Sequence, residues 1–430
     1  MRYLYVDNIR GFTNTYVPIE DVNFLVGENS TGKTTILNLI NLLGSPRFWF
    51  AQDFNTDEVE LGPFHEIVSI NSQNQDQFRL GVVESLGTKG KGLRVYATLM
   101  TFVEEGGLPI VSRYNFISET NEVRVTFSKR GVQYKVTPIA IGNGDILQIF
   151  QRWVDEDEQD DTGYKRIEGK NIPFARKASL AFIRSLLQDD SGKTRVRGEV
   201  MLPSFASDFA WLAPIRSKPK RTYDEYKLNF TPEGDHTPYL IRRLVRGKSN
   251  TATEFRSLLV KTGKASGLFD AITVKEFGRS SNAPFAVDVV IDGKELKIVN
   301  TGYGISQSLP VIVELIAREN GAWYAIQQPE VHLHPRAQAA LGDLFFQLAL
   351  EKKKRFLIET HSDFIIDRYR LNFRKKKNVN IHSQVLFFER VATGNKVQPI
   401  EINSQGEYSE NQPQAFRDFF MREQLALIGL

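Results

Sequence analysis

The stretch that decides the fold is VNFLVGENSTGKTTILNLINLLGSP, residues 22–46. An apolar run from Val22 to Val26 predicts a buried strand. The next residues, Gly27–Thr34, match the pattern G-x-x-x-x-G-K-[ST]. Apolar residues at helical spacing follow, and they end at Gly44 and Pro46, which are typical of a helix stop. A strand, a glycine-rich loop and a helix in this order predict a phosphate-binding loop.

The chemistry of such a loop follows from its residue types. Gly27 and Gly32 let backbone N–H groups wrap around phosphates at a helix N-terminus, where the helix dipole favours negative charge. Lys33 is expected to reach the β- and γ-phosphate oxygens, and the hydroxyl of Thr34 is expected to bind Mg²⁺. The predicted ligands are therefore ATP and Mg²⁺. The alternative is a chance glycine loop before a helix, which the complete motif in its required context disfavours.

Composition excludes several classes of protein. The chain has 430 residues, with 55 basic and 51 acidic side chains, so its net charge of +4 does not by itself indicate nucleic-acid binding. It has no cysteine, which excludes disulfides and thiolate metal sites. The first residues lack the apolar core of a signal peptide, and no apolar run approaches the ~20 residues that span a bilayer. We expect a cytoplasmic protein without a membrane segment.

The middle of the chain changes character near residue 140. Residues 78–140 alternate apolar and polar side chains between turn-forming segments, which predicts an antiparallel sheet of hairpins. Residues 144–210 show helical spacing around the acidic run DEDEQDD at 155–161, which we interpret as a solvated loop. The predicted division is an N-terminal lobe at 1–140, a helical insertion at 141–210 and a C-terminal lobe at 211–430.

A proline-punctuated basic loop follows Trp211. It contains Arg216, Lys218, Lys220 and Arg221. Such a loop is either solvated or faces an anion, and the sequence leaves both interpretations open.

A second anion-binding element is predicted near residue 302. A hairpin over Val287–Val299 is followed by Gly302, Gly304 and Ser306 at the start of an apolar-faced helix. Its N-terminus could bind phosphate. Since it lies far along the chain from Lys33, it need not serve the same phosphates, and could serve those bound by a partner.

Two further strands alternate with helices towards the C-terminus. The segments AWYAI and RFLIE predict buried strands, each followed by a turn and a helix, which indicates a parallel sheet. Ligands gather at the carboxyl ends of parallel strands. Gln327, Glu330 and His361 follow these strand ends, so we expect them near the loop that contains Lys33.

The motifs GENSTGKTT, NTGYGISQSLP, AIQQPEVHLHP and LIETHSD, in this order, resemble the OLD-like family of ABC/AAA ATPases. This family includes ATPase subunits of anti-phage systems such as PARIS and Septu, and its heads are distantly similar to chromosome-maintenance ATPases. The resemblance covers roughly residues 1–80 and 200–400. It implies an α/β fold, an ABC-type P-loop ATPase head with mixed parallel and antiparallel sheets and a helical insertion.

The resemblance also implies roles for individual residues. Two heads would sandwich two ATP molecules, so the protein is expected to be a homo-oligomer. Phosphates and Mg²⁺ would be held by Asn29, Ser30, Thr31, Gly32, Lys33, Thr34 and Thr35. Gly302, Gly304 and Ser306 would form the signature that faces the partner's ATP, and His361 would contact the γ-phosphate. The signatures of this class place a serine before the glycine pair, whereas Ser306 follows it, so which hydroxyl touches phosphate stays open.

No acidic nuclease (Toprim) module follows the histidine motif. The resemblance therefore implies a separate effector, a nuclease, gated by the ATPase and triggered by a phage protein. Three alternatives remain. They are a DNA-repair or chromosome clamp ATPase that binds nucleic acid, a non-hydrolysing ATP-dependent sensor scaffold, and a transporter subunit, which the long insertion disfavours.

The strand end at 327 lacks the expected acids. ATP hydrolysis needs a residue near the Mg²⁺ shell and a residue that orients the attacking water. In the family the pattern is often similar to IEQPE, so Gln327 is the unexpected residue and Gln328 is less so. A site with Gln327 should bind ATP but turn it over slowly. The explanations are an engineered replacement of Glu at 327, a natural change with Glu330 as the remaining acid, and a natural pseudo-ATPase. We interpret the nearby His332 and His334 as structural.

Overall fold

A computed structural model of the chain describes residues 1–430 except 57, 73, 87–93, 119–120, 129–130, 140–144, 158–161, 168–201, 226, 281–282, 377 and 420–430. The chain forms two compact units. The first consists of Met1–Glu20, Glu28–Phe209 and Phe388–Pro399, and the second of Asp21–Gly27, Ala210–Phe387 and Ile400–Leu430. None of the helices in the described ranges combines the length and apolar content that crossing a bilayer requires.

The first unit is built on an eight-stranded sheet in the order β2-β1-β4-β5-β6-β7-β8-β9. Its strands are β1 (Arg2–Asp7), β2 (Thr15–Pro18), β4 (Gln77–Leu86), β5 (Arg94–Glu105), β6 (Leu108–Ser118), β7 (Asn121–Ser128), β8 (Gly131–Pro138) and β9 (Lys165–Ile167). All seven neighbouring pairs are antiparallel, which confirms the hairpins predicted over residues 78–140.

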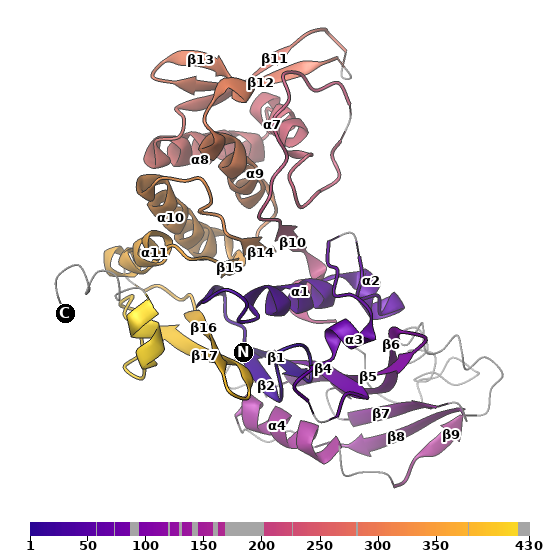
Figure 1. The fold of residues 1–430 in the computed structure, drawn as a ribbon. Helices are drawn as coiled ribbons and strands as arrows, with labels where there is room; N and C mark the ends of the chain where they lie inside the picture. Colours follow the sequence, from indigo (N-terminus) through magenta and orange to yellow (C-terminus); the bar gives the residue numbers. More distant parts are fainter. Residues whose placement is uncertain are drawn as a thin grey trace. The chain divides into compact units, whose positions relative to one another are not determined.

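Helices of the first unit are α1 (Lys33–Gly44), α2 (Pro46–Ala51), α3 (Phe64–Ile67), α4 (Ile146–Asp157) and the 3₁₀ turn η1 (Ser204–Ser207). Helix α4, labelled in Figure 1, belongs to this unit. It buries Phe150 and Trp153 in a cluster with residues of β4 and β5. It is the described helix of the predicted insertion, whose residues 168–201 lie outside the described ranges. The three-part division predicted from the sequence stays a prediction.

The second unit holds most of a six-stranded sheet in the order β10-β14-β15-β3-β16-β17. These strands are β10 (Phe209–Leu212), β14 (Trp323–Gln327), β15 (Arg355–Glu359), β3 (Val22–Gly27), β16 (Ser383–Val391) and β17 (Gly394–Ile402). Strands β14, β15 and β3 are parallel, as the alternation of strands and helices predicts. Every residue of β3 is buried, and its one polar side chain, Asn23, donates to the carbonyl oxygen of Phe356 at 3.0 Å.

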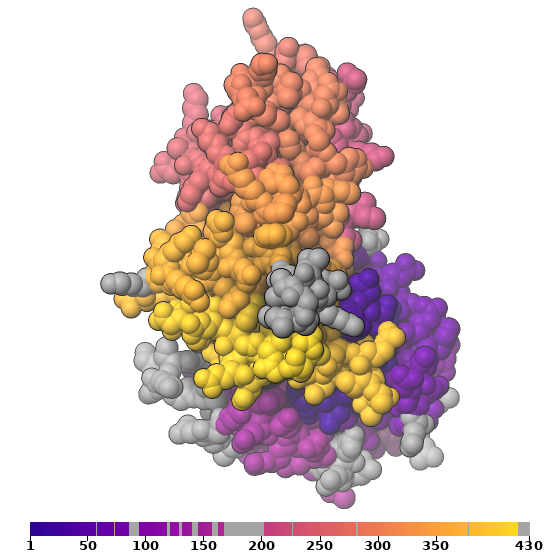
Figure 2. Space-filling view, turned by 60° about the vertical axis from the view of Figure 1, so that its left-hand side comes forward, coloured from indigo at the N-terminus to yellow at the C-terminus, as the bar shows by residue number. Residues whose placement is uncertain are grey.

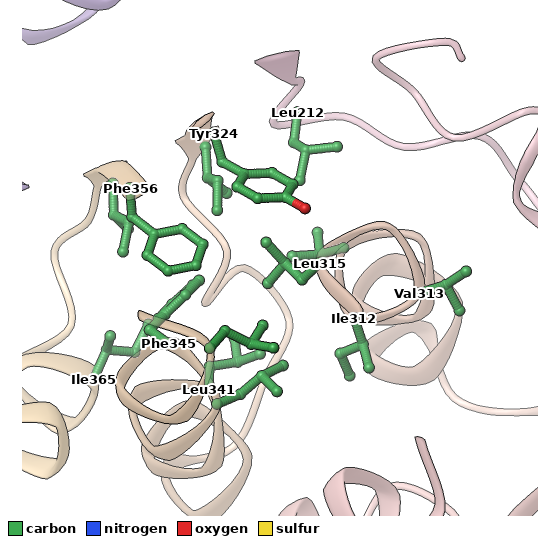
Figure 3. Packing of buried hydrophobic residues seen from close by; sticks show 14 of the residues in the cluster. Leu212, Ile312, Val313, Leu315, Tyr324, Leu341, Phe345, Phe356 and Ile365 are labelled. Carbon is green, nitrogen blue, oxygen red and sulfur yellow. The ribbon is translucent and has the colours of Figure 1, made fainter. Parts of the chain in front are cut away.

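Helices of the second unit are α7 (Thr237–Arg246), α8 (Asn250–Ser266), the 3₁₀ turn η2 (Ile298–Asn300), α9 (Tyr303–Ala317), α10 (Pro335–Lys352) and α11 (Asp363–Lys375). Apolar side chains of β14 and β15, such as Tyr324 and Phe356, pack with Leu315 of α9 and Phe345 of α10 in one core (Figure 3). This core orients the start of α9 and the carboxyl ends of β14 and β15, the segments that carry the predicted site residues of this unit.

The second unit also contains a smaller antiparallel sheet, whose central strand is largely buried. It consists of β11 (Ala271–Glu276), β12 (Phe285–Ile291) and β13 (Lys294–Lys297). The predicted hairpin over Val287–Val299 corresponds to β12 and β13, which are joined by a turn at Asp292 and Gly293 with φ angles of 49° and 71°. All four residues of β13 are exposed, and Figure 2 shows this part of the unit in orange on the surface. The α/β fold class with parallel and antiparallel sheets is thus confirmed.

Candidate functional site

Two polar side chains of the phosphate loop donate hydrogen bonds to the same backbone carbonyl oxygen. The Nζ of Lys33 donates to the carbonyl oxygen of Glu28 at 2.7 Å, and the Thr31 hydroxyl donates to the same oxygen at 2.8 Å. Lys33 is 4% exposed and is the first residue of α1. Its ammonium group is therefore held at a helix N-terminus by a loop carbonyl, a contact that a phosphate oxygen could replace.

Gly32, which caps α1, must be glycine for two reasons. Its φ is +93°, in the left-handed region that side chains disfavour. A Cβ atom at this position would lie 2.4 Å from the ring of Phe12. The loop is thus packed against an aromatic ring, and its shape is set before any ligand binds.

Two arginines that the sequence analysis did not predict contact the loop. Arg390 donates to the carbonyl oxygen of Ser30 at 2.9 Å. Arg10 donates to the carbonyl oxygen of Leu61 at 3.2 Å and lies 3.4 Å from the Thr35 hydroxyl. Burial lowers the pKa of Arg10, and the charge of Glu66 opposes this shift. Both arginines come from distant parts of the sequence, so no local pattern could have revealed them.

The other residues of the predicted phosphate set lie together in this loop. Asn29, Ser30 and Thr34 are exposed, whereas Thr31 and Thr35 are buried. Thr34 directly follows the buried lysine, and its hydroxyl is an oxygen ligand of the kind that Mg²⁺ prefers. The donor types present therefore fit Mg²⁺ and a polyphosphate.

At the carboxyl edge of the second unit's sheet, Gln327, Glu359 and Leu25 are register partners on three adjacent strands. The Nε2 of Gln327 donates to Oε2 of Glu359 at 3.1 Å, and both side chains are buried. Strand β3 ends two residues after Leu25, where the phosphate loop begins. Glu359 was not among the site residues predicted from the sequence, although an acid at the end of a predicted parallel strand is a signal that could have identified it.

Gln328 adopts a left-handed conformation directly after β14. Its φ is 42°, and its backbone N–H donates to the carbonyl oxygen of Glu359 at 2.8 Å. Such conformations in residues other than glycine persist only where the surrounding contacts impose them, and they concentrate at functional sites. The bend directs the chain from β14 towards Glu330.

The carboxylate of Glu330 is held in the same segment. Its Oε1 accepts a hydrogen bond from the backbone N–H of His361 at 2.7 Å. Burial raises the pKa of Glu330, and the His361 N–H and the nearby charge of Arg216 oppose that shift. His361 is an exposed residue, and its backbone N–H is the group that orders the acid. Its predicted contact with a γ-phosphate stays a prediction.

The environment of Arg216 differs from that of the other cations in its basic loop, which the sequence predicts to be solvated or to face an anion. Lys218, Lys220 and Arg221 of the basic loop are more accessible to solvent, but Arg216 is only 4% exposed. Its Nη2 donates to the carbonyl oxygen of Gln327 at 3.0 Å, and burial lowers its pKa to about 10. Its Nε and Nη1 atoms are shielded from solvent and have no hydrogen-bond partner among the described residues.

The backbone of Arg216 is bound to helix α9. The side chain of Gln307 accepts from the Arg216 N–H and donates to the Arg216 carbonyl oxygen, both at 3.3 Å. One side chain of α9 thus fixes the segment from which the buried guanidinium reaches the end of β14.

The predicted signature lies at the start of α9. Gly302 caps the helix, and a Cβ atom on Gly304 would lie 2.8 Å from the carbonyl oxygen of His332. The Ser306 hydroxyl is buried and donates to the carbonyl oxygen of Tyr303 at 3.0 Å. The glycine therefore allows close packing on the segment after β14, while Tyr303, 53% exposed, is the side chain presented to solvent.

His334 has a structural role. It is the N-cap of α10, and its Nδ1 accepts a hydrogen bond from the Ala337 N–H at 3.3 Å. The ring of His332 packs edge-on against Tyr303, with the ring centres 5.1 Å apart. These contacts agree with the structural interpretation of the two histidines.

Comparison with solved structures finds heads of SMC proteins. An Smc head bound to the C-winged helix domain of ScpA is 11% identical, with a TM-score of 0.44, covering 93% of this chain and 97% of that chain. The SMC head domain from Thermotoga maritima is 12% identical, with a TM-score of 0.36, covering 94% and 100%. An Smc head domain with an extended coiled coil, bound to the C-terminal domain of ScpA derived from Pyrococcus furiosus, is 10% identical, with a TM-score of 0.40, covering 93% and 97%.

No curated protein sequence matches the chain. The AAA ATPase domain family matches residues 1–130 and 216–366, which together make up more than half of the chain. These two segments contain the phosphate loop, the signature-like turn, the strand-end residues and His361. The chain therefore belongs to the AAA ATPase domain family.

Proposed function

We propose that the chain binds ATP with Mg²⁺ and hydrolyses it, and that paired heads of this chain enclose the nucleotide. The observation that carries the proposal is the phosphate loop at the N-terminus of α1, with Lys33 held on the Glu28 carbonyl and Gly32 packed on Phe12. Membership of the AAA ATPase domain family supports the same activity.

Each group of residues has a role in this proposal. Backbone N–H groups of the loop and the Lys33 ammonium bind the phosphates, and Arg10 and Arg390 hold the loop. Mg²⁺ would be held by the Thr34 hydroxyl and would supply neutralisation of phosphate charge. Glu330 and His361 lie after β14 and β15, where water and the terminal phosphate are expected.

The paired arrangement relies on the start of α9. Gly302, Gly304 and Ser306 would face the nucleotide bound by a second copy of the chain, with Tyr303 exposed beside them. Because the Ser306 hydroxyl donates to its own helix, we expect the backbone N–H groups at this helix start to make the first contact with phosphate.

The resemblance to OLD-like ATPases supports a more specific role. We place the chain in anti-phage defence, as the ATPase that restrains or releases a separate nuclease in response to a phage protein. The motif order along the sequence is the basis for this assignment. Co-purification of a nuclease with the ATP-bound chain would support it, and stimulation of the ATPase by DNA alone would favour a DNA-clamp function instead.

The rate of ATP hydrolysis is the quantity that tests the role of Gln327. An amide at this position lacks the charge and basicity of a carboxylate, so we expect slow phosphate release by the unaltered chain and a faster rate for Gln327→Glu. The measurement is phosphate release under excess ATP, with sedimentation of both proteins with and without nucleotide. Equal and substantial rates would show that Gln327 does not limit turnover, and a chain that remains monomeric with ATP would contradict the paired heads.

A further inference from the structure

The side chain that receives the Gln327 amide is itself an acid. Gln327 and Glu359 are direct register partners on β14 and β15, and their side chains meet with Nε2 and Oε2 3.1 Å apart. Both residues are buried, with exposed fractions of 8% and 5%. A buried carboxylate, that of Glu359, therefore lies at the C-terminal ends of these strands, although the sequence of β14 alone has no acid there.

The position of Glu359 in the sheet is also informative. Strand β15 lies between β14 and β3, and Glu359 is the register partner of Leu25. Neighbouring strands are about 4.8 Å apart, so Glu359 lies one strand closer than Gln327 to the strand that continues into the phosphate loop. The backbone carbonyl of Glu359 accepts from Gln328, which fixes the two strand ends together.

The chemistry of the pair explains why an amide stands at 327. Two carboxylates at this separation repel, and one of them would have to hold a proton. A glutamine removes that repulsion and donates a hydrogen bond to the carboxylate. Gln327 and Glu359 therefore form one acid–amide pair across the two strands.

We infer that Glu359 supplies the carboxylate towards Mg²⁺ that β14 lacks at position 327, and that Gln327 is the positioning residue that holds it. This inference rests on the proposed ATP-binding function. It makes Gln327 part of an acid–amide pair whose acid stands on the adjacent strand. Mg²⁺ takes oxygen ligands, directly or through its water shell, and a carboxylate at a strand end suits this preference.

The experiment compares ATP affinity with Mg²⁺ and with EDTA, a readout that needs no hydrolysis. For Glu359→Gln we expect the gain in affinity from Mg²⁺ to fall at least about tenfold, while binding of metal-free ATP is unchanged or stronger. The exposed Glu401→Gln is the matched control and should keep the full Mg²⁺ effect.

The exchange variant Gln327→Glu/Glu359→Gln keeps one carboxylate and one amide at the same edge. It should regain most of the Mg²⁺ effect, whereas Gln327→Glu alone should add none, because its two acids share a proton. The exchange variant also provides a folded comparison if Glu359→Gln melts at a lower temperature.

An unchanged Mg²⁺ effect in Glu359→Gln would overturn this inference and leave the proposed function intact. If the unaltered chain bound no ATP with or without Mg²⁺, both would fail. A larger Mg²⁺ effect in Gln327→Glu alone would also contradict the inference, since the acid would then be missing rather than displaced by one strand.

Discussion

The phosphate loop differs from the buried charged residues near the end of β14, Arg216 and Glu330, which form the strand-end cluster. The two regions hold their charged groups in different ways. In the loop, Lys33 is satisfied by a backbone carbonyl of the same loop. In the cluster, Arg216 has two buried nitrogens without partners in the described structure, and burial disfavours the ionised form of Glu330. The loop is thus complete by itself, whereas the cluster has charges that further contacts can stabilise.

This difference indicates where ligands act. A preformed loop loses little conformational entropy on binding, so it contributes mainly to affinity. Buried charges that are incompletely paired are sensitive to small shifts, because electrostatic interactions are strong where water is excluded. We therefore expect changes in the loop to affect nucleotide binding, and changes in the cluster to affect stability and its dependence on pH.

Among the changes that compare the loop with the cluster, the largest effect is expected for Gly32→Ala. The new Cβ would meet the Phe12 ring at 2.4 Å, at a φ of +93°. We expect ATP affinity to fall by at least about tenfold, since left-handed strain of about 1–2 kcal/mol adds to the clash. Isothermal titration with ATP measures the loss.

Gly107→Ala is the control for backbone strain alone. Gly107 has a φ of +82°, lies in the β5–β6 turn, and has no atom within 4 Å of the position that a Cβ would occupy. This variant should bind ATP like the unaltered chain. If Gly32→Ala also bound ATP normally, the shape of the loop would not depend on its packing against Phe12.

A smaller effect, on stability, is expected for Arg216→Met. It removes the donor to the Gln327 carbonyl and the cation near Glu330, which should destabilise the fold by about 1–3 kcal/mol. The control is Arg368→Met, because Arg368 forms an ion pair with Asp343 in which the two side chains are 40% and 38% exposed. That change should cost less than about 1 kcal/mol.

Chemical denaturation of the two arginine variants measures the difference. Equal losses would mean that the burial of Arg216 has no energetic consequence. A more stable Arg216→Met would show that desolvation of the guanidinium outweighs its contacts, so that the cation is kept for a purpose other than stability.

The smallest effect concerns pH. Because burial raises the pKa of Glu330 in the folded chain, the folded state binds a proton more tightly than the unfolded state. Stability from this group is therefore present below the ordinary carboxyl pKa and is lost as pH rises through the raised pKa. Without nucleotide, the melting temperature of Glu330→Gln relative to the unaltered chain should be higher at about pH 7 than at about pH 4.

The exposed Glu401→Gln is the control for replacing a surface carboxyl with an amide. If the difference in melting temperature between Glu330→Gln and the unaltered chain were the same at both pH values, Glu330 would not carry a raised pKa.

The sequence predicts the contiguous parts of this molecule well. The strand, loop and helix around Lys33 and the hairpins of residues 78–140 follow from local patterns, and the structure contains them. Glu359 and Arg216 were not assigned to the site because their roles depend on strand register and burial. Glu359 matters through its neighbour on β14, and Arg216 stands in a basic run whose other cations are more accessible. Such relations appear only once distant segments are brought together.

The most direct test of the central claim is the equilibrium binding of ATP to the unaltered chain and to Lys33→Ala. Lys33 is the buried cation at the start of α1, whereas Lys294 lies exposed on β13 and serves as the control. The account predicts that the unaltered chain and Lys294→Ala bind ATP equally well and that Lys33→Ala binds it at least about a hundredfold more weakly, a difference of about 2.7 kcal/mol. Equal affinities in all three proteins, or no binding by the unaltered chain, would contradict it.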